Sequence, residues 1–161
     1  MNNQDSQIKN FFELNYKSLK FFLINKLGVR EANASMRTKQ IWQSVYKRGS
    51  FEINNFTTYP LDLRKKLSIM VSLERPKIIR TQKSTDGTIK WLIELFDKNR
   101  VECVYIPEKT RATLCISSQV GCTLNCRFCH TGTQRLVKNL DFSEIVSQVM
   151  IAKEQINDWE E

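Results

Sequence analysis

Hydrophobic and polar positions alternate with two different periods along the chain. In roughly the first 75 residues apolar positions recur at helical spacing. Three helices are predicted there, over residues 18–28, over residues 36–48 and after Pro60. A glycine ends each of the first two, as is typical of helix C-termini. The pattern predicts a small helical domain at residues 1–78.

After Pro76 the apolar residues alternate with polar ones, as in half-buried strands. Asp86-Gly87 is a hairpin signal, and the alternation runs through residues 88–96 and 101–106. In the second run one face holds Val101, Cys103 and Tyr105, and the other holds Glu102, Val104 and Ile106. We therefore predict a short antiparallel β unit at residues 79–110.

The segment at residues 111–161 starts with a predicted strand over 112–117, followed by a cysteine-rich loop. Asp141 and Glu144 then have the spacing of a capping box that opens a helix. Strand, loop and helix form the first step of a β/α repeat, so the predicted fold class is α/β. Because a parallel strand needs a neighbour, we expect this strand to leave an open edge and the repeat to be truncated.

Composition indicates a soluble globular protein, since 41% of the 161 residues are hydrophobic and 26% are charged. The N-terminus is polar, and the apolar runs are too short to span a bilayer. We therefore expect a cytoplasmic protein with no membrane partner. A reducing compartment disfavours a disulfide framework and favours metal binding or catalysis by the five cysteines.

The net charge of +8 is uneven along the sequence. Residues 1–80 contain 15 Lys/Arg and 6 Asp/Glu (+9), and residues 81–161 contain 10 and 11 (−1). This asymmetry indicates that the N-terminal half contacts a polyanion, most simply nucleic acid, although a solvated helical surface explains it equally well. Trp42 and Tyr46 could stack on bases, but aromatics at helical spacing are usually core residues, and we expect these to pack.

Cys122, Cys126 and Cys129 have the spacing C-x3-C-x2-C on one loop. Three thiolates this close can bind one iron–sulfur cluster, and three ligands for four irons leave one iron open. An open coordination position lets a metal centre bind a substrate. The alternative is zinc with His130 as fourth ligand. We disfavour it, because zinc ligands usually form two separated pairs and a histidine directly after a cysteine can hardly reach the same ion.

The triad, with Phe128 directly before its last cysteine, resembles the signature of radical S-adenosylmethionine enzymes. The wider segment VECVYIPEKTRATLCISSQVGCTLNCRFCHTGTQRLVKNLDFSEIVSQV resembles the entry segment of the RlmN/Cfr family of 23S rRNA and tRNA adenine-C2 methyltransferases. The helices around KQIWQSVYKRG and FTTYPLDLRKKL are similar to the accessory domain of that family. The resemblance covers the N-terminal portion of the family and implies that residues 111–161 begin a truncated radical-SAM partial β/α barrel.

The resemblance implies a role for five residues. Cys122, Cys126 and Cys129 match the ligands of a [4Fe-4S] cluster. Cys115 matches a second catalytic cysteine, which helps to resolve a covalent RNA adduct and ends in a disulfide. Glu102 matches a proton acceptor. Taken without the resemblance, Cys115 would be a core thiol and Glu102 an exposed strand residue.

The family reaction uses S-adenosylmethionine twice. One molecule methylates a distal cysteine, and the second supplies a radical that removes hydrogen from that methyl group. The resulting carbon adds to adenine C2, and deprotonation releases the product. The resemblance also implies a monomer that binds 23S rRNA and tRNA and takes electrons from a donor such as flavodoxin.

Family members are longer than this chain, and their S-adenosylmethionine-binding segments and methylated cysteine follow the first barrel helix. We therefore expect this chain to be an incomplete and inactive part of the enzyme. The alternative function is a zinc-binding RNA-binding module without catalysis, in which the basic helical half recognises RNA.

Overall fold

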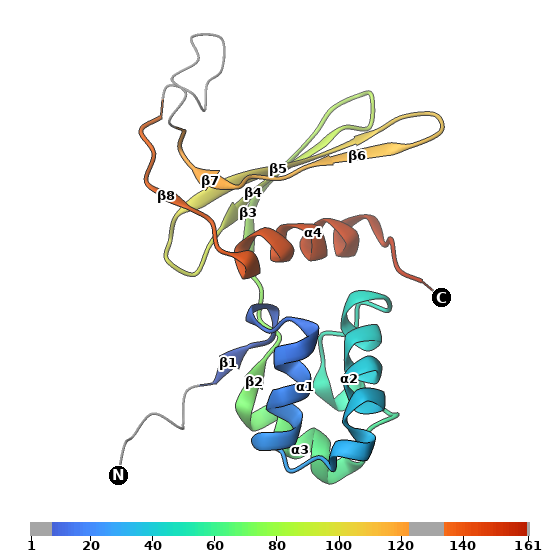
Figure 1. Cartoon of the computed structure of the whole chain (residues 1–161). Helices are drawn as coiled ribbons and strands as arrows, with labels where there is room; N and C mark the ends of the chain where they lie inside the picture. The colour runs from blue at the N-terminus through green and yellow to red at the C-terminus, as the bar shows by residue number, and fades with distance from the viewer. Residues whose placement is uncertain (1–7, 123–133, 161) are drawn as a thin grey trace. The chain divides into compact units, whose positions relative to one another are not determined.

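The chain forms two compact units in a computed structural model that describes residues 8–122 and 134–160. The first unit is Met1–Glu74 together with Asn157–Glu161, and the second is Arg75–Ile156. Figure 1 shows helices in the first unit and a sheet together with a helix in the second. The strands predicted on either side of residue 111 therefore share one unit.

The first unit is built from three helices. These are α1 (Tyr16–Asn25), α2 (Glu31–Tyr46) and α3 (Leu61–Met70), joined by the 3-10 turns η1 (Phe11–Glu13) and η2 (Ile53–Asn55) and by a parallel pair of two-residue strands, β1 (Lys9–Asn10) and β2 (Val71–Ser72). Asn15 caps α1, since its Oδ1 accepts a hydrogen bond from Ser18 N at 2.9 Å. Helix α2 starts five residues before its predicted start. The sequence has no capping signal there, since Arg30 at the N-cap makes no side-chain capping bond.

Aromatic rings fill much of the core of this unit. Phe11 and Phe12 are fully buried, and the ring centroid of Phe11 lies 5.8 Å from that of Tyr46. The centroids of Trp42 and Tyr46 are 4.4 Å apart. The prediction that Trp42 and Tyr46 pack rather than project is confirmed. Burial raises the pKa of Tyr46 to about 12.

The last described residues pack on the end of α2. The Trp159 ring occupies the space that a Cβ of Gly49 would take, and Gly49 has a φ of +61°. Glu160 N donates to Lys47 O at 3.0 Å, and the two side chains form an ion pair at 2.8 Å. The turn after α2 therefore requires glycine for its conformation and for this contact.

The second unit contains a four-stranded antiparallel sheet in the order β3-β4-β5-β6. Its strands are β3 (Lys77–Lys83), β4 (Ile89–Glu94), β5 (Arg100–Pro107) and β6 (Ala112–Cys115), followed by the small pair β7 (Gln119–Val120) and β8 (Lys138–Asn139) and by α4 (Phe142–Ile156). Strand β6 pairs antiparallel with β5, a neighbour that was not predicted, and it is the last strand of this sheet, so its other edge is open as predicted. A tight turn closed by Glu108 N donating to Arg111 O at 2.8 Å makes this pairing possible.

Helix α4 covers one face of this sheet (Figure 1). The buried cluster between them consists of Trp91, Ile93, Leu95, Val101, Cys103, Leu140, Ile151 and Ala152. Side chains alternate along a strand, and the face of β5 that holds Val101 and Cys103 is the buried one.

Helix α4 begins at the predicted capping box. Asp141 Oδ1 accepts a hydrogen bond from Glu144 N at 2.9 Å, and Glu144 Oε2 accepts one from Asp141 N at 3.0 Å. Near its other end Glu154 binds both terminal nitrogens of Arg75, at 2.8 and 2.9 Å.

The predicted α/β class, with a helical part followed by an antiparallel unit, is confirmed. No helix in the described parts of the chain is long and apolar enough to span a membrane.

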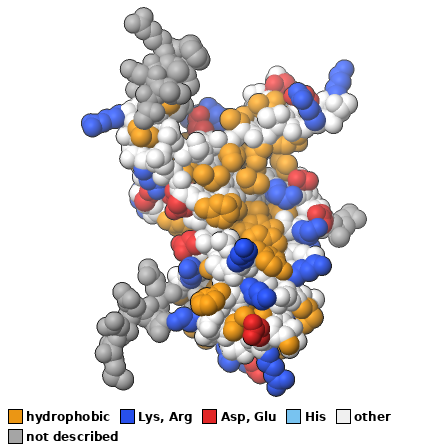
Figure 2. Space-filling view, in the orientation of Figure 1, with side chains coloured by type: hydrophobic (Ala, Val, Ile, Leu, Met, Phe, Trp, Pro, Cys, Tyr) orange, Lys and Arg blue, Asp and Glu red, His pale blue; other side chains and the backbone are white. Residues whose placement is uncertain are grey.

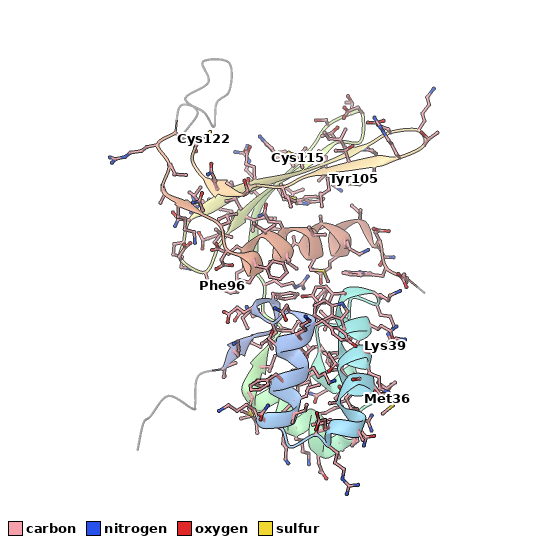
Figure 3. The ribbon with its side chains drawn as sticks, viewed as in Figure 1. Met36, Lys39, Phe96, Tyr105, Cys115 and Cys122 are labelled. Atoms are coloured by element: carbon pink, nitrogen blue, oxygen red, sulfur yellow. The ribbon has the colours of Figure 1, made fainter. Side chains whose placement is uncertain are left out.

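We expect Trp91→Ala to destabilise the second unit by about 3–5 kcal/mol, because the side chain is 1% exposed and its removal leaves a large cavity. Phe96→Ala is the control, since this side chain is 52% exposed (Figure 3), and its loss should change the free energy of unfolding by less than about 0.5 kcal/mol. Urea unfolding of both variants measures this. Equal losses would contradict the assigned core.

Candidate active site and cysteine loop

Glu102 and Cys115 lie on the same face of the sheet. Cys115 is paired with Val104 in the register of β5 and β6, and Glu102 is two residues from Val104 on β5. Diagonal neighbours of this kind have Cα atoms about 7–8 Å apart. Both residues are exposed, on the face that α4 leaves uncovered, and Figure 3 shows Cys115 on the sheet.

The Glu102 side chain forms an ion pair with Lys90 on β4, with 3.0 Å between Nζ and Oε1. The two side chains are 53% and 39% exposed, so the pair orients the carboxylate more than it stabilises the fold. Lys90 is not among the site residues predicted from the sequence. The signal was present, because the polar turn between β4 and β5 sets a register in which Leu92 faces Glu102 and Lys90 is its diagonal neighbour.

Glu102 also lines a cavity of about 260 Å³. The lining residues are Leu92, Arg100, Val101, Glu102, Ser117, Gln119, Gly121 and Gln134. Gly121 and Gln134 stand at the two ends of the cysteine loop. The cavity therefore joins the open face of the sheet at Glu102 to the base of that loop.

The base of the loop is closed by main-chain hydrogen bonds. Cys122 N donates to Gln134 O at 3.0 Å, and Val137 N donates to Val120 O at 2.8 Å. The chain therefore enters and leaves the loop at adjacent points, and Figure 3 shows Cys122 at the entry.

Two of the three predicted cluster ligands, Cys126 and Cys129, lie outside the described residues, and so does His130. Within residues 8–122 and 134–160 no three His, Cys, Asp or Glu side chains form a group that could hold a metal ion. Assignment of the three cysteines to a cluster therefore stays a prediction. The donor set itself, three thiolates on one loop, fits iron–sulfur chemistry.

Gly121, directly before Cys122, has a φ of +76°. A Cβ at this position would collide with the carbonyl oxygen of Arg135 on the returning chain. Only glycine fits both the backbone conformation and this close approach.

The returning chain is fixed by Lys138 on β8. Its Nζ donates to Glu144 Oε1 at 2.7 Å and also to Asp97 Oδ2 in the turn between β4 and β5. The hydrogen bond from Lys138 lowers the pKa of Asp97 to about 2. Leu140 N donates to Ser118 O at 2.9 Å, so the chain that leaves the loop is tied to the sheet, to α4 and to the chain that enters the loop.

Neighbouring strands hold two cysteines in opposite environments. Cys103 is fully buried, and burial, with a smaller effect of nearby Cys115, raises its pKa to about 11. Cys115 is exposed, and no disulfide joins Cys103, Cys115 or Cys122. Of the two thiols on β5 and β6, only that of Cys115 is accessible to a reactant.

The net charges of the two folded units differ from those of the two halves of the sequence. The first unit has 12 Lys/Arg and 9 Asp/Glu (+3), and the second has 13 and 8 (+5). Arg75, Lys77 and Arg80 belong to the second unit, while acidic residues near the C-terminus belong to the first. Lys and Arg side chains accordingly appear on the surface of both (Figure 2).

The chain is similar to RNA methyltransferases of known sequence. No protein-family model matches it. It is 48% identical over 142 residues to the dual-specificity RNA methyltransferase RlmN of Rhodopseudomonas palustris strain BisB5, a match covering 84% of this chain and 36% of that protein. It is 49% identical over 139 residues to the RlmN of Nitrobacter winogradskyi, covering 83% and 35%.

A solved structure is also similar to this chain. A radical SAM methyltransferase from Sphaerobacter thermophilus superposes with a TM-score of 0.80 and 30% sequence identity, over 93% of this chain and 43% of that one. The predicted resemblance to the RlmN family is confirmed. The chain spans about a third of the length of the curated relatives that it matches.

We expect Gly121→Ala to open the base of the cysteine loop. Gly28→Ala is a matched control, since Gly28 has a φ of +70° but no heavy atom within 4 Å of an added Cβ. In both variants an alanine must adopt the left-handed backbone conformation, which lowers the free energy of unfolding by roughly 1–2 kcal/mol. Only Gly121→Ala adds a clash with Arg135, and hydrogen exchange at residues 119–122 should accelerate only in that variant. Unchanged exchange there would contradict the proposed fit.

Proposed function

From the sequence that this chain shares with the RlmN family, we propose that it forms part of a radical-SAM RNA methyltransferase. The substrate would be C2 of adenosine in 23S rRNA and tRNA, methylated through a methyl-cysteine intermediate. The observation that supports this most directly is the arrangement of Glu102 and Cys115 on one open sheet face, with a cavity from Glu102 to the base of the cysteine loop.

In this proposal Cys122, Cys126 and Cys129 bind a [4Fe-4S] cluster through their thiolates. Cys122 stands at the loop entry, where its main-chain N–H is fixed by Gln134 O, so the first ligand has a defined starting point. When bound, the cluster and S-adenosylmethionine supply the electron and the carbon that the reaction needs.

Glu102 accepts the proton that leaves the adenine carbon. Its carboxylate is oriented by Lys90 and faces the cavity, which is the geometry a general base needs. The Cys115 thiolate attacks the sulfur of the cysteine that carried the methyl group. The bond from that sulfur to the adduct carbon breaks, the carbon keeps the electron pair and takes up a proton, and the two sulfurs form a disulfide. The diagonal placement of Glu102 and Cys115 puts both groups on the same open face of the sheet.

RNA is the partner in this proposal, with contacts from exposed basic residues of the helical unit, such as Lys65 and Lys66 on α3. A donor such as flavodoxin supplies electrons to a monomeric cytoplasmic protein. The positive charge of the second unit supports an RNA contact there as well.

Anaerobic reconstitution with iron and sulfide tests the cluster. We expect about four iron and four sulfide ions per chain and a cluster signal in electron paramagnetic resonance after reduction. Cys126→Ala should lose the signal, whereas Cys115→Ala, the matched control, should keep it. Zinc in the protein as purified, with no uptake of iron and sulfide on reconstitution, would overturn the proposal and support a zinc-containing RNA-binding module.

RNA binding by the helical unit is tested with the double variant Lys65→Ala and Lys66→Ala. The logarithm of the binding constant decreases with the logarithm of the salt concentration. If each lysine neutralises one phosphate, the magnitude of this slope should decrease by about 1.4–1.8. A second double variant, Lys98→Ala and Lys109→Ala, tests the RNA contact of the second unit, where both lysines are exposed in turns. Fluorescence anisotropy with a tRNA at several salt concentrations gives the slopes. An unchanged slope in the Lys65→Ala and Lys66→Ala variant would contradict an RNA contact on α3.

A further inference from the structure

Gln148 places a fully buried amide in the face of α4 that packs on the sheet. Its Oε1 accepts a hydrogen bond from Ser117 N at 2.9 Å, and its Nε2 donates to Ser117 O at 2.9 Å. The same Nε2 donates to Glu144 O at 3.2 Å. Both main-chain groups of one residue are thus bound by one side chain.

Ser117 lies where the chain leaves the sheet. Strand β6 ends at Cys115 and β7 begins at Gln119, so the Ser117 peptide groups lie outside both ladders. Gln148 gives them the donor and acceptor that a neighbouring strand would give. The Ser117 hydroxyl donates to Glu102 O at 2.8 Å, which ties the same residue to β5.

This contact lies between the residues of the proposed chemistry. Ser117 is two residues after Cys115, five before Cys122 and hydrogen-bonded to Glu102. A shift at Ser117 therefore changes where Cys115 lies relative to Glu102 and where the cysteine loop begins. The link between α4 and this turn is the pair of bonds between Gln148 and Ser117.

We propose that Gln148 is a positioning residue, which fixes Cys115, Glu102 and the entry of the cysteine loop relative to one another. The catalytic meaning of this inference rests on the proposed function, while the physical effect does not. The amide acts by its hydrogen-bonding pattern, in which it accepts from Ser117 N and donates to Ser117 O, as well as by its volume. Its orientation is set, since a flipped amide would place a donor against Ser117 N and an acceptor against Ser117 O.

The variant Gln148→Met in the full chain keeps the volume and removes the pattern. Loss of a buried hydrogen bond should accelerate hydrogen exchange at the Ser117 amide by roughly tenfold. It should also increase the rate at which iodoacetamide alkylates Cys115, measured by peptide mass spectrometry. Ser147→Ala is the matched control, because Ser147 is equally buried on α4 but does not bind Ser117, and it should change neither rate.

The variant Gln148→Glu separates hydrogen bonding from space filling. An ionised carboxylate cannot donate to Ser117 O, whereas a protonated one reproduces both bonds of the amide to Ser117. The ionised carboxylate still accepts from Ser117 N but faces the Ser117 carbonyl oxygen without a donor, so we expect lower exchange protection at Ser117 at pH 8 than in the wild type, and protection close to that of the wild type at pH 5. Protection is compared with the wild type and Ser147→Ala at the same pH, which removes the intrinsic effect of pH on exchange.

Three results would overturn the inference. These are unchanged exchange at Ser117 in Gln148→Met, equal acceleration in Ser147→Ala, and protection in Gln148→Glu that does not depend on pH. If Gln148→Met does not fold, Gln148→Glu at pH 5 decides alone, and failure to recover wild-type protection there counts against the inference. Exchange and alkylation are measured without metal, so failed cluster reconstitution would leave this result intact.

Discussion

The second unit depends on one constraint. Between Cys115 and Cys122 the chain leaves a sheet and enters a loop, and its main-chain N–H and C=O groups must still find hydrogen-bond partners. Unpaired buried peptide groups cost about 1–3 kcal/mol each. The structure meets this need residue by residue. Gln148 binds Ser117, Leu140 N binds Ser118 O, and Cys122 N binds Gln134 O. Helix α4 and the returning chain therefore define the loop entry.

The register of β5 follows from the same packing and separates stability from chemistry. Cys103 faces Trp91 and α4, while Glu102 faces the open side. A slip by one residue would exchange these faces, burying a carboxylate and exposing the core. The hydrophobic face thus fixes which side chains are available for reaction. This explains why Cys115 is accessible and Cys103 is not, although they lie on paired strands.

Local sequence signals predicted the local features. Alternation over residues 101–106 gave the correct faces, the Asp141–Glu144 spacing gave the correct start of α4, and the cysteine spacing gave the family resemblance. Features that depend on contacts between distant residues were missed. The pairing of β6 with β5 leaves no periodic signal in the sequence. Gln148 was also missed, because a glutamine among the apolar residues of a helix face looks like an interruption of that face, although its side chain is buried.

Charge counted along a sequence differs from charge on a folded unit, and this changes what an RNA partner would encounter. The window of residues 1–80 carries all of the basic excess, yet it includes three cations that fold into the second unit and omits acidic residues that fold into the first. An RNA attracted by phosphate neutralisation would therefore find positive charge on both units. Sequence specificity would have to come from contacts other than charge, because phosphate contacts position a nucleic acid without reading its bases.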